Sequence, residues 1–366
     1  MAVLRKIVVQ DFRNISLAEL SFSSNVNCIS GGNGEGKTNL MDAIYYLSMT
    51  KSSFSSSDRY CFRHGTDSFS LSGTYRMKDI DSRFSIRVTS GGEKKLRKDE
   101  KLYGRVSDHV GEIPIVMVSP SDIALVSDSG EDRRRFLNLV LSQMDPEYLS
   151  AMQQYNKLLA QRNQLLKNGT VDISLLEIMD ESLSYHADKI YVTRKAFAEK
   201  LSPVASGYYG LLSGGREQVR VAYRSDLSSG PLSELLASNR QKDAVLGFTT
   251  SGIQRDDLVF LMDGHPIKRC GSQGQQKSFL VSLKFAQYEL MKEDSGVPPI
   301  LLLDDVFDKL DMDRTANLLS MVAGNEFGQI FITDSNKVRL SGIVDGITRD
   351  REYFEASGGN FTEAEV

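Results

Sequence analysis

The 366-residue sequence lacks tryptophan, has only 3 cysteines and 4 histidines, and contains no long apolar run. Cys28, Cys61 and Cys270 lie far apart without a CxxC pair, so neither a disulfide framework nor a zinc site is indicated. The N-terminal MAVLRKIVVQDF is interrupted by charges before a signal-like segment forms, and a membrane span needs about 20 apolar residues. We therefore expect a cytoplasmic protein without a membrane partner.

An excess of positive charge is also missing, because 44 Lys and Arg residues face 48 Asp and Glu residues and the formal net charge is -4. The pI of about 5.7 argues against a permanently basic nucleic-acid coat. In EKKLRKDEK (93–101) the acids dilute the cations, so a solvated hairpin is favoured over contact with a phosphodiester backbone. The arginines at 133–135 begin a predicted helix, where cations oppose the macrodipole, and we expect them to form salt bridges within the helical lobe.

Apolar periodicity divides the chain into three segments. Residues 1–120 and 246–366 have α/β texture, with strands expected over 69–90 and 102–118, while 121–245 is mainly helical. Within the middle segment, one predicted helix has Asp145 as cap, Pro146 in its first turn and Gly169 as stop, and a second helix covers about 172–201. The all-apolar ILLL (300–303) predicts a strand at the centre of a sheet covered on both faces. We predict an α/β head with a mixed sheet, formed by the two outer segments, and an inserted, mainly helical lobe.

The stretch GGNGEGKT (31–38) matches the phosphate-binding pattern GxxxxGK[ST] between a predicted strand and a predicted helix. Its glycines allow backbone N–H groups to point at a phosphate, and the helix N-terminus adds positive potential. We expect Lys37 to bind the outer phosphates of ATP and to act in catalysis, and the Thr38 hydroxyl to ligate Mg²⁺. An ordinary glycine-rich turn is the less favoured alternative. The expected ATP-binding loop comprises Gly31, Gly32, Asn33, Gly34, Glu35, Gly36, Lys37 and Thr38.

The run ILLLDD supplies a second element of the same chemistry. It is an apolar strand that ends in Asp304, whose carboxylate is expected to hold Mg²⁺, and Asp305, expected to orient or polarise the attacking water in catalysis. A strand followed by an acidic turn is common, so this run gains its weight from the phosphate loop.

The phosphate loop, the polar GSQGQQKSF (271–279) before a predicted helix, ILLLDD and DKLD follow one another in the order of ABC-type P-loop ATPases, which this sequence resembles. The resemblance implies that Ser272, Gly274 and Gln275 contact ATP held by a second subunit, and that Asp311, the last acid of DKLD, lies at the same dimer interface. Further segments resemble the RecF family: FRN (12–14), RRRFLNLVLSQMDPEYL, YNKLLAQRNQLLK, GIQRDDLVF, SQGQQKSFLVSLKFAQ and PPILLLDDVFDKLD.

The resemblance implies an ATP-bound homodimer that clamps DNA at gaps or at single/double-strand junctions. It further implies that the dimer works with recombination mediator proteins to load the RecA recombinase in DNA repair, replication, recombination and the SOS response, and that slow hydrolysis reopens it. Because Asp305 stands where a glutamate is usual, we expect a weak, DNA-stimulated ATPase. The alternatives are the ATPase subunit of an ABC transporter, which the long insert opposes, and a small-molecule kinase, which leaves 271–279 and DKLD without a task.

Several positions depart from the related patterns. Gln254 stands where the RecF family has a histidine, and the signature reads SQGQQ instead of the transporter SGGQ. No glutamine occurs in 113–122, where relatives have one that contacts Mg²⁺, and Thr333 with Asp334 replaces the transporter switch histidine. For Arg13 and Asn14, a place near the nucleotide and a solvated strand end are both open.

Overall fold

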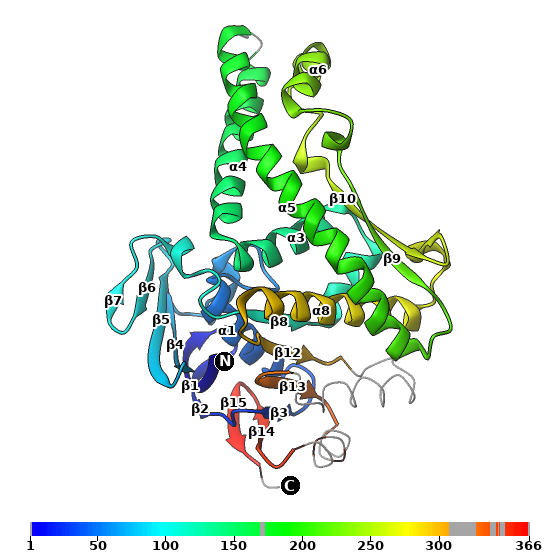
Figure 1. Cartoon of the computed structure of the whole chain (residues 1–366). Helices are drawn as coiled ribbons and strands as arrows, with labels where there is room; N and C mark the ends of the chain where they lie inside the picture. The colour runs from blue at the N-terminus through cyan, green and yellow to red at the C-terminus, as the bar shows by residue number, and fades with distance from the viewer. Residues whose placement is uncertain are drawn as a thin grey trace.

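The structure is a computed structural model that describes residues 2–168, 173–306, 327–336, 342, 344 and 348–364. Its central sheet has the strand order β15-β14-β3-β13-β12-β8, in which only β15 is antiparallel to its neighbour (Figure 1). Both outer segments of the sequence contribute to this mixed sheet, which confirms the predicted fold class. Its strands are β3 (Val26–Ser30), β8 (Ile115–Val118), β12 (Ile300–Asp304), β13 (Ile330–Asp334), β14 (Arg351–Ser357) and β15 (Asn360–Glu363).

Strand β12 lies inside the sheet, between β13 and the edge strand β8 rather than at the centre as predicted, and its apolar side chains are fully buried. Ile300 and Leu302 pack into the core that contains helix α1 (Lys37–Met49), whereas Leu301 and Leu303 pack into the core formed with the helical lobe. Each such side chain contributes roughly 1.5–3 kcal/mol by leaving water. The continuous apolar run therefore reflects two covered faces, as predicted.

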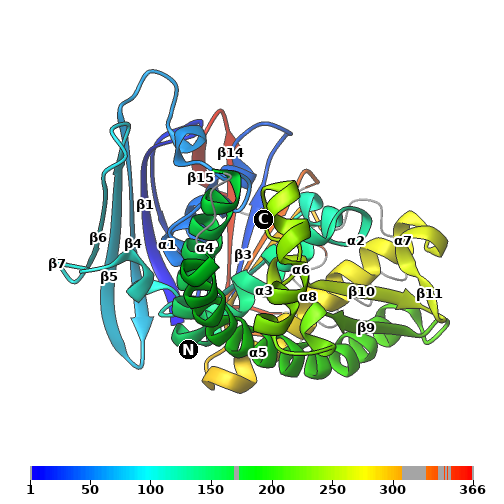
Figure 2. The same cartoon turned by 90° about the horizontal axis from the view of Figure 1, so that it is seen from above.

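A second sheet flanks the head, and α1 lies between it and the central sheet (Figure 2). It is antiparallel throughout, with the order β2-β1-β4-β5-β6-β7. Residues 69–90 form strands as expected, whereas within 102–118 only the end of β7 and β8 are extended; His109, in a 3₁₀ turn, is buried against the Leu47 carbonyl (2.7 Å). The strands are β1 (Ala2–Phe12), β2 (Ile15–Ser21), β4 (Ser68–Met77), β5 (Ile80–Thr89), β6 (Lys94–Lys98) and β7 (Lys101–Leu102).

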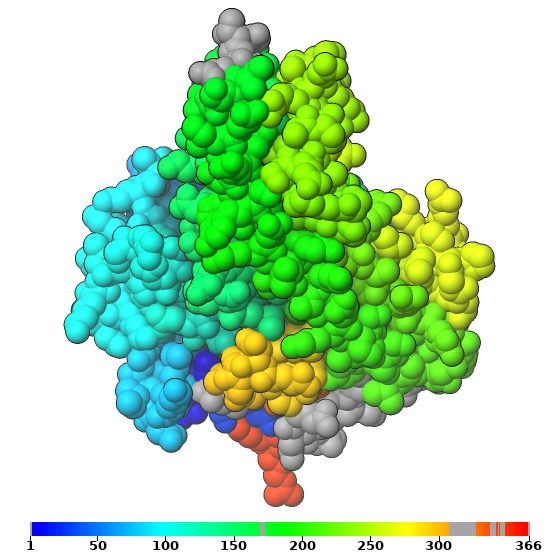
Figure 3. Space-filling model, turned by 45° about the horizontal axis from the view of Figure 1, so that its top comes forward, coloured from blue at the N-terminus to red at the C-terminus, as the bar shows by residue number. Residues whose placement is uncertain are grey.

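The helical lobe protrudes from the head (Figure 3). Helix α4 begins as predicted, because the Asp145 carboxylate accepts the Glu147 N–H at 2.8 Å and Pro146 occupies the first turn, while Gly169 lies outside the described residues. The predicted end of the next helix at 201 was wrong, since α5 continues through Pro203 to Ser213. The lobe helices are α2 (Ala124–Ser127), α3 (Gly130–Met144), α4 (Pro146–Lys167), α5 (Ile173–Ser213) and α6 (Leu232–Leu246).

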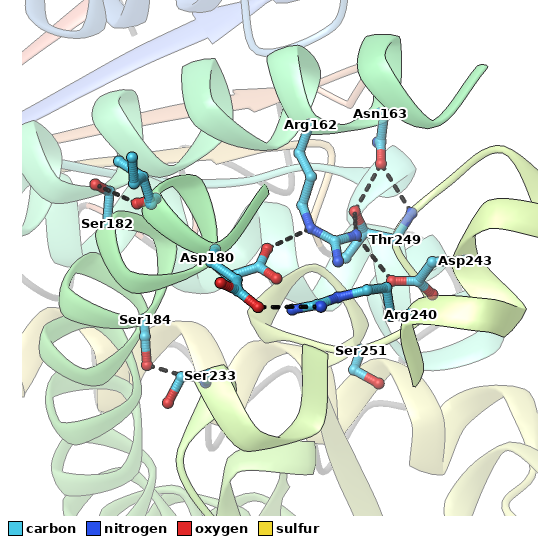
Figure 4. Close-up of polar contacts among 12 residues, drawn as sticks. Arg162, Asn163, Asp180, Ser182, Ser184, Ser233, Arg240, Asp243, Thr249 and Ser251 are labelled. Carbon is cyan, nitrogen blue, oxygen red and sulfur yellow. Dashed lines mark hydrogen bonds and ion pairs between the residues drawn. The ribbon is translucent and has the colours of Figure 1, made fainter. Parts of the chain in front are cut away.

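A buried polar cluster joins three of these helices (Figure 4). Arg162 of α4 donates from Nε to Asp180 of α5 at 2.6 Å, and from Nη1 to Asp243 of α6 at 2.8 Å and to the Thr249 hydroxyl at 2.9 Å. Arg162 and Asp243 are completely buried. Removing one charge would therefore strand the opposite one in a dry interior, which is costly.

Helix α8 (Gln273–Ser295) connects the lobe to the head. Its Phe279 and Phe285 contact Tyr209 and Tyr208 of α5, and its end is followed by β12. Alongside lie α7 (Ile267–Cys270) and a small antiparallel sheet of β9 (Val219–Arg224), β10 (Asp257–Met262) and β11 (His265–Pro266). Among the described helices, none has the length and apolarity to cross a bilayer. The segment boundaries at 121 and 246 stay a prediction.

Candidate nucleotide-binding site

The phosphate loop connects β3 to α1 at the edge of the central sheet where the parallel strands end. Gly31 has φ 150°, and a Cβ at this position would lie 2.5 Å from the Ala356 carbonyl oxygen of β14, so only glycine fits. Gly36 caps α1 with φ 110°. The first N–H groups of α1 therefore open onto the loop, and the helix dipole makes this end attractive to anions.

The two polar side chains at the start of α1 have different partners. Lys37 is 4 % exposed, and its ammonium donates to the carbonyl oxygens of Gly31 and Gly32 at 2.8 Å each, so the side chain lies across the loop. The Thr38 hydroxyl donates to both carboxylate oxygens of Asp304, at 3.0 and 2.9 Å. A pocket of about 340 Å³ opens here, lined by Asn33, Gly34, Gly36, Lys37, Thr38, Asn39 and Asp305.

Asp304 is held by a residue that the sequence analysis did not assign to the site. The Thr333 hydroxyl, at the end of β13, donates to Asp304 Oδ1 at 2.7 Å and accepts the Asp305 backbone N–H at 3.0 Å. Asp305 has φ 45°, a left-handed conformation that is costly for a residue with a side chain. The sequence signal for Thr333 was its place after the apolar QIFI, where transporters have the switch histidine.

The oxygen cluster formed by Thr38 and Asp304 fits a hard cation. Burial raises the pKa of Asp304, while the hydrogen bonds from Thr333 and Thr38 lower it. A divalent cation would stabilise the ionised carboxylate in this desolvated place. A hydroxyl and a carboxylate leave the remaining positions of an octahedral Mg²⁺ shell to phosphate oxygens and water.

Two hairpins from distant parts of the chain buttress the loop. At the β14–β15 turn, the Gly359 N–H donates to the Glu35 carbonyl at 2.9 Å and the Gly358 N–H donates to the Glu35 carboxylate. At the β1–β2 turn, the Asn14 side chain accepts the Asn39 amide at 2.7 Å. The β14–β15 turn therefore restrains the loop, and the β1–β2 turn restrains the first turn of α1.

Of the two residues left open at the β1–β2 turn, only Asn14 lies beside the loop. Arg13 instead pairs with the buried Asp42 at 2.8 Å and donates to Ser52 at 3.0 Å. Burial raises the pKa of Asp42, and the Arg13 charge opposes that effect. Arg13 therefore anchors the turn to α1.

The signature residues stand at the N-terminus of α8. The Ser272 hydroxyl accepts the Gln275 N–H at 3.3 Å, and the Gln275 side chain accepts the Ser272 N–H at 2.7 Å and donates to Glu217 at 2.7 Å. Ser272 is exposed, and Gly274 follows in the first turn. Ser272, Gly274 and Gln275 do not line the pocket at the phosphate loop of their own chain. Asp311 lies outside the described residues.

Arg133 and Gln254, which belong to two further sequence motifs, form contacts outside the phosphate-binding pocket. Arg133 forms a salt bridge as expected, but its partner Asp257 (2.6 Å) lies in the segment 246–366 and not in the predicted lobe. Gln254 accepts a hydrogen bond from the Tyr155 hydroxyl at 2.5 Å and donates to the Ser251 carbonyl at 2.8 Å. At the position of the family histidine, Gln254 therefore has a structural environment within the lobe.

A family model described as an AAA domain matches residues 6–201. The chain is 42% identical over 359 residues to the DNA replication and repair protein RecF of Porphyromonas gingivalis, which covers 98% of this chain and 99% of the relative. It is also 42% identical over 345 residues to RecF of Flavobacterium johnsoniae, covering 93% and 96% of the two chains.

Solved structures are also similar to this chain. The fold is similar to that titled the recombination mediator protein RecF-ATP in the RecFOR pathway, with a TM-score of 0.89 and 28% identity over 100% of this chain and 98% of the other. An Smc head domain from Pyrococcus furiosus is similar with a TM-score of 0.60 and 15% identity, covering 100% of this chain and 96% of the other. This second likeness concerns the fold alone.

Proposed function

The chain belongs to the RecF family of DNA replication and repair proteins, and from this premise we propose that it is an ATP-dependent DNA-binding protein whose ATP-bound dimer closes on DNA. The observation that carries the proposal is the joined set of Lys37, Thr38, Asp304 and Thr333 at the edge of the central sheet. This set belongs to a phosphate loop, a form of site that holds a nucleoside triphosphate.

In the proposed site, the loop N–H groups and Lys37 bind the ATP phosphates, and Thr38 with Asp304 holds Mg²⁺. When bound, Mg²⁺ supplies positive charge beside the phosphates. Thr333 keeps the Asp304 carboxylate turned toward Thr38, since its hydroxyl bonds one of the two carboxylate oxygens. The site is thus preorganised by the hydrogen bonds of the protein itself.

Asp305 is the proposed group that orients the attacking water. Its half-buried position on the pocket wall and its backbone bond to Thr333 restrict where its carboxylate can reach. The side chain of an aspartate is one methylene shorter than that of the usual glutamate, so the ATPase is weak and hydrolysis is slow. Hydrolysis serves to reopen the dimer. DNA stimulates it by favouring the closed form.

The second half of each site comes from another copy of the chain. Ser272, Gly274 and Gln275 lie on an accessible helix N-terminus, outside their own chain's pocket, and such a terminus attracts a phosphate. We place Asp311 at the same interface. The closed dimer binds DNA at gaps or single/double-strand junctions in the cytoplasm, and it acts with mediator proteins in loading RecA during repair, replication, recombination and the SOS response.

Sedimentation velocity with and without ATP, Mg²⁺ and a gapped duplex tests nucleotide, dimer and DNA together. The wild type is expected to dimerise and to bind the duplex only with ATP and Mg²⁺. Lys37→Met should abolish both events through loss of the phosphate charge, whereas Ser272→Arg should bind ATP as a monomer. Asp305→Asn should bind ATP and DNA and release DNA more slowly. Nucleotide-independent DNA binding by the wild type would refute the proposal.

A further inference from the structure

The outward face of the flanking sheet gathers hydroxyl and cationic side chains from three strands. On β5, Arg87 lies opposite Ser70 of β4 and Lys95 of β6, and Ser85 lies opposite Ser72 of β4 and Arg97 of β6. We call this set, completed by Arg83, the basic sheet face. The strand registers thus combine two sequence stretches, 83–87 and 95–97, that are each only moderately basic.

The basic sheet face points away from the rest of the molecule. The alternate side chains of the same strands, including Phe84, Ile86 and Leu96, are buried against α1 and the head. The sheet forms one flank of the molecule, with its other side turned outward (Figure 2). A shallow groove of about 490 Å³ runs over β4, β5 and β6 on this outward side.

The cationic side chains on the two sides of β6 differ in whether they form ion pairs. The inward lysines are neutralised, because Lys94 pairs with Asp58 at 2.8 Å and Lys98 pairs with Glu112 at 2.5 Å. On the outward side, Arg87 and Arg97 are exposed and form no ion pair within the described part of the chain. The groove therefore holds two uncompensated guanidinium groups.

The other two cations of the face, Arg83 and Lys95, form only weak, exposed contacts with acidic side chains. Arg83 donates to the Ser72 hydroxyl at 3.0 Å and lies 3.9 Å from Glu100, while Lys95 pairs with Glu93 at 2.8 Å across exposed side chains. Such exposed pairs contribute about 0–1 kcal/mol, so a phosphate can replace the acid at little cost.

We propose that the basic sheet face binds the phosphodiester backbone of duplex DNA, an inference that rests on the DNA-binding function proposed above. Arginine, lysine and serine are the side chains that contact phosphate oxygens, and guanidinium does so in a bidentate manner. The outward positions of β4, β5 and β6 carry no aromatic side chain for stacking on unpaired bases, which favours duplex over single strands. The face holds the duplex beside the gap.

The test compares two double variants that each remove two exposed arginines from a strand or its entry. Arg87→Gln/Arg97→Gln removes the two arginines of the basic sheet face that form no ion pair among the described residues. Arg216→Gln/Arg220→Gln is the control, because these residues are also exposed, form no ion pair among the described residues, and lie at β9 in another sheet. Binding to a gapped duplex is measured with ATP and Mg²⁺ between about 0.05 and 0.3 M salt, alongside ATP affinity and thermal unfolding.

Each arginine–phosphate pair that is removed lowers the slope of log K against log salt by about 0.9, so the Arg87/Arg97 variant should have a slope about 1.8 smaller and bind about 60-fold more weakly near 0.1 M salt. ATP affinity and unfolding temperature should equal those of the wild type. An unchanged slope in a wild type that binds DNA would overturn this inference and leave the proposed function standing. An equal weakening in the control variant would overturn it too, since net charge alone would then explain the effect.

Two further outcomes also decide the matter. Unchanged DNA binding with lost binding to vesicles containing anionic phospholipid would assign the face to a membrane surface and overturn the proposal. If the wild type shows no ATP-dependent DNA binding, both the proposed function and this inference fail. Loss confined to DNA binding by the Arg87/Arg97 variant supports the proposal.

Discussion

Replacing Gly359 by alanine tests whether the β14–β15 turn holds the phosphate loop in shape. Gly359 has φ 81°, and a Cβ there would lie 2.4 Å from the Asn14 carbonyl oxygen. An ordinary contact begins at 3.4 Å, so the turn must retreat by about 1 Å. That shift breaks the 2.9 Å bond from the Gly359 N–H to the Glu35 carbonyl, which costs about 0.5–1.5 kcal/mol.

Gly264 provides a matched control. It has the same φ of 81°, but no atom lies within 4 Å of its would-be Cβ. Both variants carry a left-handed alanine that costs roughly 1–2 kcal/mol, and both should unfold at a lower temperature. Only Gly359→Ala should bind ATP about 2- to 10-fold more weakly in a calorimetric titration. Equal ATP affinity in the two variants would refute the idea that the turn shapes the site.

Three other changes address the site, the lobe and the head. Thr333→Val removes the hydroxyl that donates to Asp304. Since a hydrogen bond to a charged group contributes about 1.5–3 kcal/mol, Mg²⁺-dependent ATP binding should weaken about 10- to 100-fold. Thr333→Ser keeps the hydroxyl and should bind ATP normally, so equal ATP affinities of the two variants would contradict this prediction. Arg162→Met should lower the free energy of unfolding in urea by about 3–5 kcal/mol by stranding two buried carboxylates, with ATP affinity unchanged, and a decrease below about 1 kcal/mol would count against it. Burial lowers the pKa of His109 below its ordinary 6.5, so the contribution of His109 to stability is present above pH 6.5 and is lost as the pH falls toward the folded-state pKa. His109→Gln should therefore flatten the decline of the unfolding temperature below pH 6.5. A decline equal to that of the wild type would rule this out.

Local pattern predicted the elements whose signals lie close together in sequence. The capped start of α4 and the continuous apolar β12 follow from neighbouring residues, and both are confirmed. The predicted end of this helix at 201 was wrong because the prediction followed local apolar periodicity alone. Packing of Ala205, Tyr209 and Leu212 in the core keeps the helix, α5, intact beyond Pro203. Tertiary contacts outweigh local preference there.

The same distinction separates the parts of the site. Lys37, Thr38 and Asp304 belong to contiguous motifs, so their residue types and order were sufficient to find them. Thr333 and Gly359 reach the loop through strand neighbours that are tens to hundreds of positions away in sequence. The basic sheet face likewise exists only through strand register, and no run of letters displays it.

Helix α5 gives the lobe mechanical leverage over small motions of the head. From the contacts of Tyr208 and Tyr209 with α8 to Ile173 at the far end, the helix spans 35 residues, or about 50 Å. A tilt of about 5° imposed by α8 would carry that far end through about 4 Å by the length of the helix alone. Pro203 cannot donate to the helix ladder, so α5 lacks one backbone donor close to this contact. A small displacement at the head thus becomes a displacement of the far end of α5 about as large as the thickness of a base pair.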